Sequence, residues 1–124
     1  WGVGQHYYQL KHGLDLNGSE SFCLNAIHQD QVVIRPSNAD VFASSEFCQN
    51  AGLVYGDRIL TVQAHPEFTT GYEKALLKSL KEEVIPAAIT EQGLATLEQD
   101  DASADALMFA RYMARFLARL QPTG

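Results

Sequence analysis

A histidine and a carboxylate stand two residues apart in Ala64-His65-Pro66-Glu67-Phe68, directly after an apolar run that we expect to be a buried strand. An imidazole can take the proton of a thiol and return it to a leaving group, and a carboxylate on its other ring nitrogen fixes its tautomer. In an extended segment, residues i and i+2 point to the same side, and Pro66 stiffens the link. The spacing therefore predicts a catalytic base, His65, and its orienting acid, Glu67, in contact and facing an open pocket.

The nucleophile that such a pair would serve is not evident in the sequence. A nucleophilic cysteine or serine of this kind stands on a sharp turn between a strand and a helix, with glycines on either side. Cys23 lies in an apolar run and Cys48 follows Glu46-Phe47, and neither has such a turn around it. We interpret both as reduced, buried thiols of a cytoplasmic protein.

The composition indicates one globular domain. The chain has 124 residues, of which 46% are hydrophobic and 19% charged, and this is typical of a single packed core. The net charge of −6 disfavours nucleic acid and anionic membranes as partners. No apolar run approaches the roughly 18 residues of a membrane helix. The histidines show no metal-binding spacing, and we expect neither a metal nor a cofactor.

Apolar runs between turn residues predict that the first two thirds of the chain are rich in β-strands. We expect strands at 1–11, 21–28, 41–44, 53–55 and 58–64, and a further apolar segment at 31–35. Gly56-Asp57 is typical of a hairpin turn. The strand over 58–64 presents His65 at its end.

From Thr70 the apolar period becomes helical. Tyr72, Leu76, Leu80 and Val84 predict a helix that Pro86 ends or kinks, and a weaker helix follows over 87–98 with Gly93 inside it. Asp100-Asp101-Ala102-Ser103 provides acidic and capping residues for a third helix. Its expected apolar face comprises Ala106, Phe109, Ala110, Met113, Phe116, Leu117 and Leu120. We interpret Arg111, Arg115 and Arg119 as a solvated face, and the fold class as α/β.

Three segments resemble the class I (triad-type) glutamine amidotransferases. Residues 62–68 resemble the C-terminal signature of that family, and residues 27–32 resemble its "SHxDxV" segment. Trp1-Gly2-Val3-Gly4 resembles the "GWGVG" stretch of the branch similar to the amidotransferase domain of GMP synthase. The order and approximate spacing of the three segments also fit the family.

The resemblance implies that residues 1–124 are the C-terminal half of a flavodoxin-like α/β sandwich with a mixed sheet. In this family a cysteine on an upstream elbow attacks the side-chain amide of glutamine, and ammonia passes to a synthase partner. His65 and Glu67 match the catalytic histidine and glutamate of the family. His28, Gln29 and Asp30 match the loop whose backbone contacts the α-amino and carboxylate end of bound glutamine.

Several functions remain open at this point. A stand-alone relative would cleave γ-glutamyl compounds, and a degenerate relative would be a non-catalytic binding module. A small α+β interaction domain without chemistry is a third alternative. Because the elbow is absent, we expect residues 1–124 alone to be inactive. We also expect them to need the N-terminal half, a second copy or a swapped partner to cover an exposed sheet edge.

Overall fold

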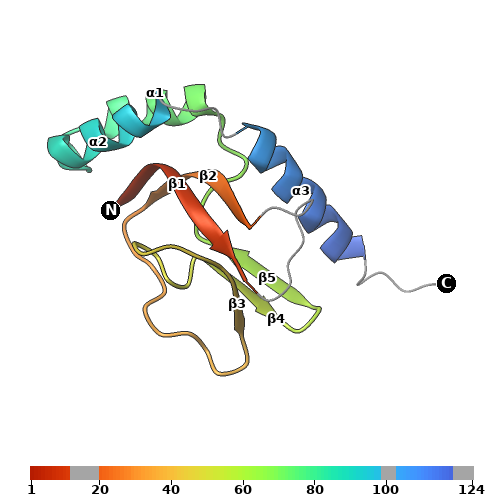
Figure 1. The fold of residues 1–124 in the computed structure, drawn as a ribbon. Helices are drawn as coiled ribbons and strands as arrows, with labels where there is room; N and C mark the ends of the chain where they lie inside the picture. The colour runs from red at the N-terminus through yellow and green to blue at the C-terminus, as the bar shows by residue number, and fades with distance from the viewer. Residues whose placement is uncertain (12–19, 99–102, 119–124) are drawn as a thin grey trace.

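A computed structural model of the chain describes residues 1–11, 20–98 and 103–118. These residues form five strands followed by three helices (Figure 1). The strands are β1 (Gly2–Leu10), β2 (Ser21–His28), β3 (Asp40–Ser44), β4 (Gly52–Tyr55) and β5 (Ile59–Val62), and the helices are α1 (Thr70–Leu80), α2 (Ala87–Leu97) and α3 (Ser103–Ala118). The predicted order, strands first and helices after, is confirmed.

The strands form one curled sheet in the order β2-β1-β3-β4-β5, and every neighbouring pair is antiparallel. The pairing of β1 with β2 is long and runs from Gly2 opposite His28 to Gln9 opposite Ser21. By contrast, β1 meets β3 at only two positions. The parallel strands of the mixed sheet that the resemblance implies are not among the described residues.

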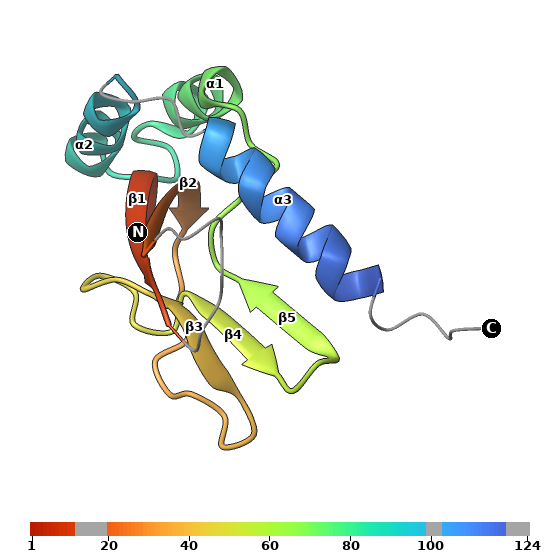
Figure 2. The ribbon, with the colours of Figure 1, turned by 45° about the vertical axis from the view of Figure 1, so that its right-hand side comes forward.

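Two apolar clusters hold the helices against the sheet. Phe109 of α3 lies between two aromatic rings of the strands, with ring centroids 5.4 Å from Phe22 and 6.1 Å from Phe42. The helices α1 and α2 pack near the start of β1, where Val3 is buried together with Leu77, Ile85 and Leu97. Figures 1 and 2 show α1 and α2 side by side at one end of β1 and β2, and α3 beside β5.

The close approach of α2 to β1 depends on two glycines. Gly4 has φ +86°, and a Cβ atom there would lie 2.1 Å from Thr96 Oγ1 and 2.6 Å from the Gly93 carbonyl oxygen. A Cβ atom on Gly93 would lie 2.6 Å from a methyl group of Val3. Glycine inside a helix costs about 1 kcal/mol relative to alanine, so Gly93 is explained by this contact rather than by helix formation.

Replacing Gly4 by alanine is expected to lower the free energy of unfolding by about 3 kcal/mol, because the variant combines a left-handed φ with overpacking against backbone. The measurement is urea unfolding of the full-length protein. Gly71→Ala is the matched control, since a Cβ atom there meets nothing within 4 Å; its effect should stay below about 1 kcal/mol. Equal stability of the Gly4→Ala variant and the wild type contradicts this account.

One strand prediction was wrong in detail, and one apolar segment is not buried. The apolar segment at 31–35 lies outside the strands, and its Val33 and Ile34 are 79% and 81% exposed. The strand expected over 58–64 covers only Ile59–Val62, and its residues alternate between exposed and half-buried. It is therefore not a buried strand, because within the described residues β5 pairs with β4 alone.

The apolar face expected for α1 was also wrong. The helix ends at Leu80, and its fully buried residues are Glu73 and Leu77, whereas Tyr72 and Val84 are more than half exposed. The pattern of apolar residues could not identify this face, because one of its two buried members is a glutamate.

The third helix largely follows its prediction. Phe109 and Phe116 are buried, and Arg111 and Arg115 are exposed as expected. Leu117, expected in the apolar face, is 61% exposed, and Ala110 is also exposed. The ring of Tyr112 packs beside Phe109 and Phe116 instead. Arg119, Leu120 and residues 100–102 of the expected cap lie outside the described residues.

Candidate active site

His65 follows β5 closely, and its ring contacts the carboxylate of Glu67. The distance between His65 Nδ1 and Glu67 Oε1 is 2.6 Å. An ionised carboxylate only accepts hydrogen bonds, so Nδ1 donates and Nε2 of the neutral ring keeps its lone pair. The side chains are 35% and 61% exposed, so the pair is open to solvent. The contact predicted between these two residues is present.

The reason for this contact differs from the expected one. Residues 65–68 form a turn rather than an extended segment, because the Phe68 N–H donates to the His65 carbonyl oxygen at 3.1 Å. Pro66 and Glu67 occupy the two central positions of the turn, and proline is favoured at the first of them. The turn, rather than the two-residue period of a strand, brings Glu67 to His65.

An aromatic stack fixes the plane of the His65 ring. The Phe68 ring lies parallel to it, with centroids 4.2 Å apart and 9° between the planes, and Tyr72 lies 4.8 Å beyond Phe68. The helix α1 begins at this point, where the Thr69 hydroxyl accepts the Tyr72 N–H at 3.1 Å. The first turn of α1 therefore supports the ring from one side.

Asn25 of β2 holds both ends of the 65–68 turn. Its carbonyl oxygen accepts the His65 N–H at 2.8 Å, and its side-chain Nδ2 donates to the Phe68 carbonyl oxygen at 3.0 Å. Asn25 is 3% exposed. Asn25 was not among the residues predicted from the sequence, although an amide inside an otherwise apolar strand indicates a buried polar group that needs a partner.

The predicted substrate loop lies at the end of β2. His28 turns its ring inward, and Nδ1 donates to the Asp30 carbonyl oxygen at 3.0 Å, whereas Gln29 and Asp30 are exposed. Gly2 leaves room for this ring, because a Cβ atom there would lie 2.7 Å from His28 Nε2. The His28 side chain therefore fixes the shape of the loop. The backbone of the loop and the side chains of Gln29 and Asp30 remain available to a substrate.

The loop and the His65–Glu67 pair belong to one neighbourhood. Burial lowers the pKa of His28, the bond to the Asp30 carbonyl partly opposes this effect, and the nearby charges of His6 and His65 lower the pKa further. The fold links the two groups through β2, because Asn25 binds both ends of the 65–68 turn and His28 ends the same strand three residues later.

The two cysteines do not join this site as nucleophiles. Cys23 and Cys48 are 4% and 1% exposed and form no disulfide. Burial raises the pKa of the Cys48 thiol, whereas a nucleophilic cysteine needs a lowered one. Their interpretation as buried thiols is confirmed.

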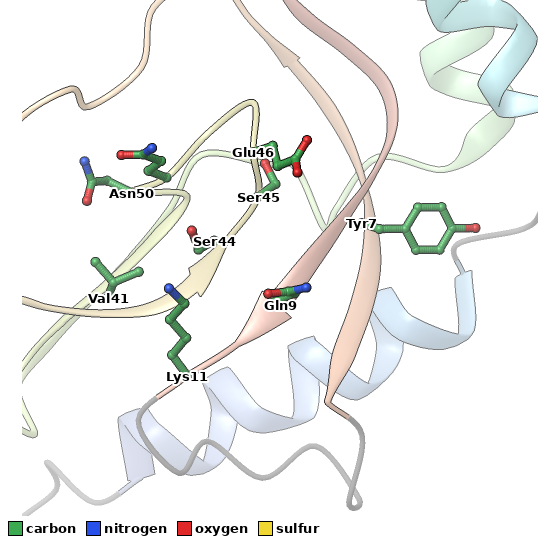
Figure 3. A pocket seen from close by; sticks show the side chains of 9 residues that line it. Tyr7, Gln9, Lys11, Val41, Ser44, Ser45, Glu46 and Asn50 are labelled. Carbon is green, nitrogen blue, oxygen red and sulfur yellow. The ribbon is translucent and has the colours of Figure 1, made fainter.

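Two surface pockets lie away from the pair. The larger, about 650 Å³, is shown in Figure 3 and is lined by Tyr7, Gln9, Lys11, Val41, Ser44, Ser45, Glu46, Gln49 and Asn50. The smaller, about 290 Å³, lies over Val32, Val33 and Phe47. Neither is lined by His65 or Glu67, so the pocket expected in front of the pair is not one of these two.

Within the part of the chain that the structure describes, no helix is long and apolar enough to cross a bilayer. In the same residues, no three His, Cys, Asp or Glu side chains are grouped in a way that could hold a metal ion.

The fold is that of glutamine amidotransferase-like proteins. A glutamine amidotransferase from Thermotoga maritima aligns with 93% of this chain and 50% of its own, at a TM-score of 0.69 and 19% identity. A second, from Methylobacillus flagellatus, aligns with 98% of this chain and 54% of its own, at a TM-score of 0.59 and 20% identity. At these identities the likeness defines the fold alone.

Relatives in sequence belong to the same group of proteins, although no protein-family model matches the chain. A Saccharomyces cerevisiae protein assigned to the glutamine amidotransferases is 43% identical over 68 residues, which are 54% of this chain and 27% of that protein. Gamma-glutamyl peptidase 3 of Arabidopsis thaliana is 28% identical over 106 residues, 83% of this chain and 41% of its own. The chain therefore spans less than half the length of these relatives.

Proposed function

We propose that residues 1–124 are the C-terminal half of a class I glutamine amidotransferase domain that hydrolyses the side-chain amide of glutamine or of a γ-glutamyl compound. The observation that carries this proposal is the 2.6 Å contact between His65 Nδ1 and Glu67 Oε1, held in place by Asn25 and Phe68 within an amidotransferase-like fold. His65 is the general base and acid, and Glu67 orients it.

The geometry supports a division of roles in the reaction. His65 Nε2 takes the proton of a thiol, and the thiolate attacks the amide carbon. Glu67 stabilises the imidazolium that forms, and the imidazolium returns the proton to the departing ammonia or amine. Water then hydrolyses the glutamyl thioester with the same base. His28, Gln29 and Asp30 form the loop that receives the α-amino and carboxylate end of the substrate.

We place the nucleophile outside residues 1–124, since both cysteines of the described residues are buried. The same part of the protein is the proposed occupant of the edge of β5 that has no strand partner among the described residues, where Ile59 is 51% exposed. The two amidotransferase crystal structures described above are about twice as long as the region that matches this chain. On this proposal the 124 residues alone are inactive. The GMP-synthase-like branch, a synthase partner and a cytoplasmic location remain predictions.

A stand-alone γ-glutamyl hydrolase is the second candidate function, because one relative is a gamma-glutamyl peptidase. The test is an assay of the full-length protein with glutamine and with γ-glutamyl dipeptides, in which released ammonia and released amine are measured. Faster turnover of the dipeptides identifies a peptidase, and faster turnover of glutamine identifies an amidotransferase. Absence of both products contradicts an enzyme and favours a non-catalytic binding module.

A further inference from the structure

The loop that follows β2 is tied down at Val32 by two side chains from other segments. The Val32 N–H donates to Gln63 Oε1 at 2.9 Å, and the Val32 carbonyl oxygen accepts from Asn50 Nδ2 at 3.0 Å. Just before it, Gln31 Nε2 donates to the Phe47 carbonyl oxygen at 3.0 Å. Both backbone polar groups of Val32 are therefore satisfied by side chains and not by a strand partner.

Gln63 links this loop to the candidate base. It stands two residues before His65, and its own N–H donates to the Ala51 carbonyl oxygen at 2.8 Å. The His65 N–H is fixed in turn on Asn25 of β2. The backbone on either side of Gln63 is thus held, so its side chain sets the distance between the loop and the segment that carries His65.

Packing alone does not hold the loop in place. Val32 is 38% exposed, and the next two side chains, Val33 and Ile34, are exposed almost completely. A segment without buried apolar contacts or ladder hydrogen bonds opens readily. The bonds from Gln63 and Asn50 are the described contacts that oppose such opening at Val32.

We propose that Gln63, together with Asn50, is a positioning residue that holds loop 28–32 in register with His65, so that a substrate bound by the loop presents its amide to the base. This inference rests on the proposed function. It predicts that loss of this clamp of two hydrogen bonds weakens substrate binding and leaves the chemical step intact, because both side chains bond to Val32, whereas His65 Nδ1 bonds to Glu67.

The experiment compares three variants of the full-length protein. Gln63→Met removes the acceptor at nearly constant volume, and Gln63→Glu keeps it. Gln49→Met is the matched control, because it makes the same change at an exposed glutamine next to Asn50. For Gln63→Met we expect KM to rise about fivefold to tenfold, because the variant loses one hydrogen bond between the loop and the segment that carries His65. Its kcat should stay within about twofold of the wild-type value. Gln63→Glu and Gln49→Met should keep the wild-type KM.

Hydrogen exchange at the Val32 amide provides a readout that does not need activity. Gln63→Met should speed this exchange about tenfold, and Asn50→Leu should do the same from the other side of the loop. Unchanged exchange, or faster exchange with an unchanged KM, overturns the proposal, as does a loss confined to kcat. If the wild type hydrolyses neither substrate class, the proposed function fails, while exchange at Val32 still decides whether the clamp exists.

Discussion

Replacing His65 by alanine in the full-length protein is expected to lower kcat for amide hydrolysis by about a thousandfold or more, because the variant loses both the base for the thiol and the acid for the leaving group. The fold should persist, since the side chain is 35% exposed and its backbone N–H still binds Asn25. The measurement is steady-state release of ammonia or amine, with circular dichroism as the check on folding.

Glu67 provides a graded comparison for His65. Glu67→Gln keeps an oxygen near Nδ1 but removes the charge that stabilises the imidazolium, so a smaller loss of about tenfold to a hundredfold is expected. Glu83→Gln, an exposed glutamate beyond α1, is the matched control and should leave kcat unchanged. A His65→Ala variant within tenfold of the wild type would contradict the role proposed for the pair.

The contact between neighbouring residues of the site could be predicted from the sequence, whereas the long-range hydrogen bonds that hold the site in place could not. His65 and Glu67 are two residues apart, and their contact follows from the sequence even though a turn produces it. Asn25 reaches the same turn across 43 residues, and Gln63 reaches Val32 across 31. Such bonds from a side chain to a distant backbone group leave no periodic pattern.

The same distinction explains the fold. Apolar runs between turn residues located the five strands, because alternation and breakers act within a few residues. The pattern failed at 31–35, where three aliphatic residues suggested burial but side chains from elsewhere hold an exposed loop. The apolar pattern failed again on α1, where tertiary packing buries a glutamate. A charged residue of this type is expected at the surface.

That carboxylate, Glu73, is fully buried on α1, and neither of its oxygens has a hydrogen-bond partner among the described residues. A charged carboxylate in such a place loses its hydration without compensation. Burial accordingly raises the pKa of Glu73 from 4.5 to about 8. The folded protein therefore carries a neutral Glu73 at pH 7, whereas the unfolded chain ionises it.

Stability is therefore expected to fall as the pH rises from about 5 to about 8, by up to about 1.4 kcal/mol per pH unit, because over this window the folded state holds a proton that the unfolded state has released. Glu73→Gln keeps the shape of the neutral acid and has no proton to lose, so its advantage over the wild type should grow with pH to about 4 kcal/mol near pH 8. The half-buried histidines His6 and His28 have lowered pKa values and give the opposite slope below about pH 6.5. Their effect is common to both proteins and cancels in the difference. Urea unfolding of both proteins at several pH values measures this difference, and parallel profiles would show that Glu73 is ionised in the folded state.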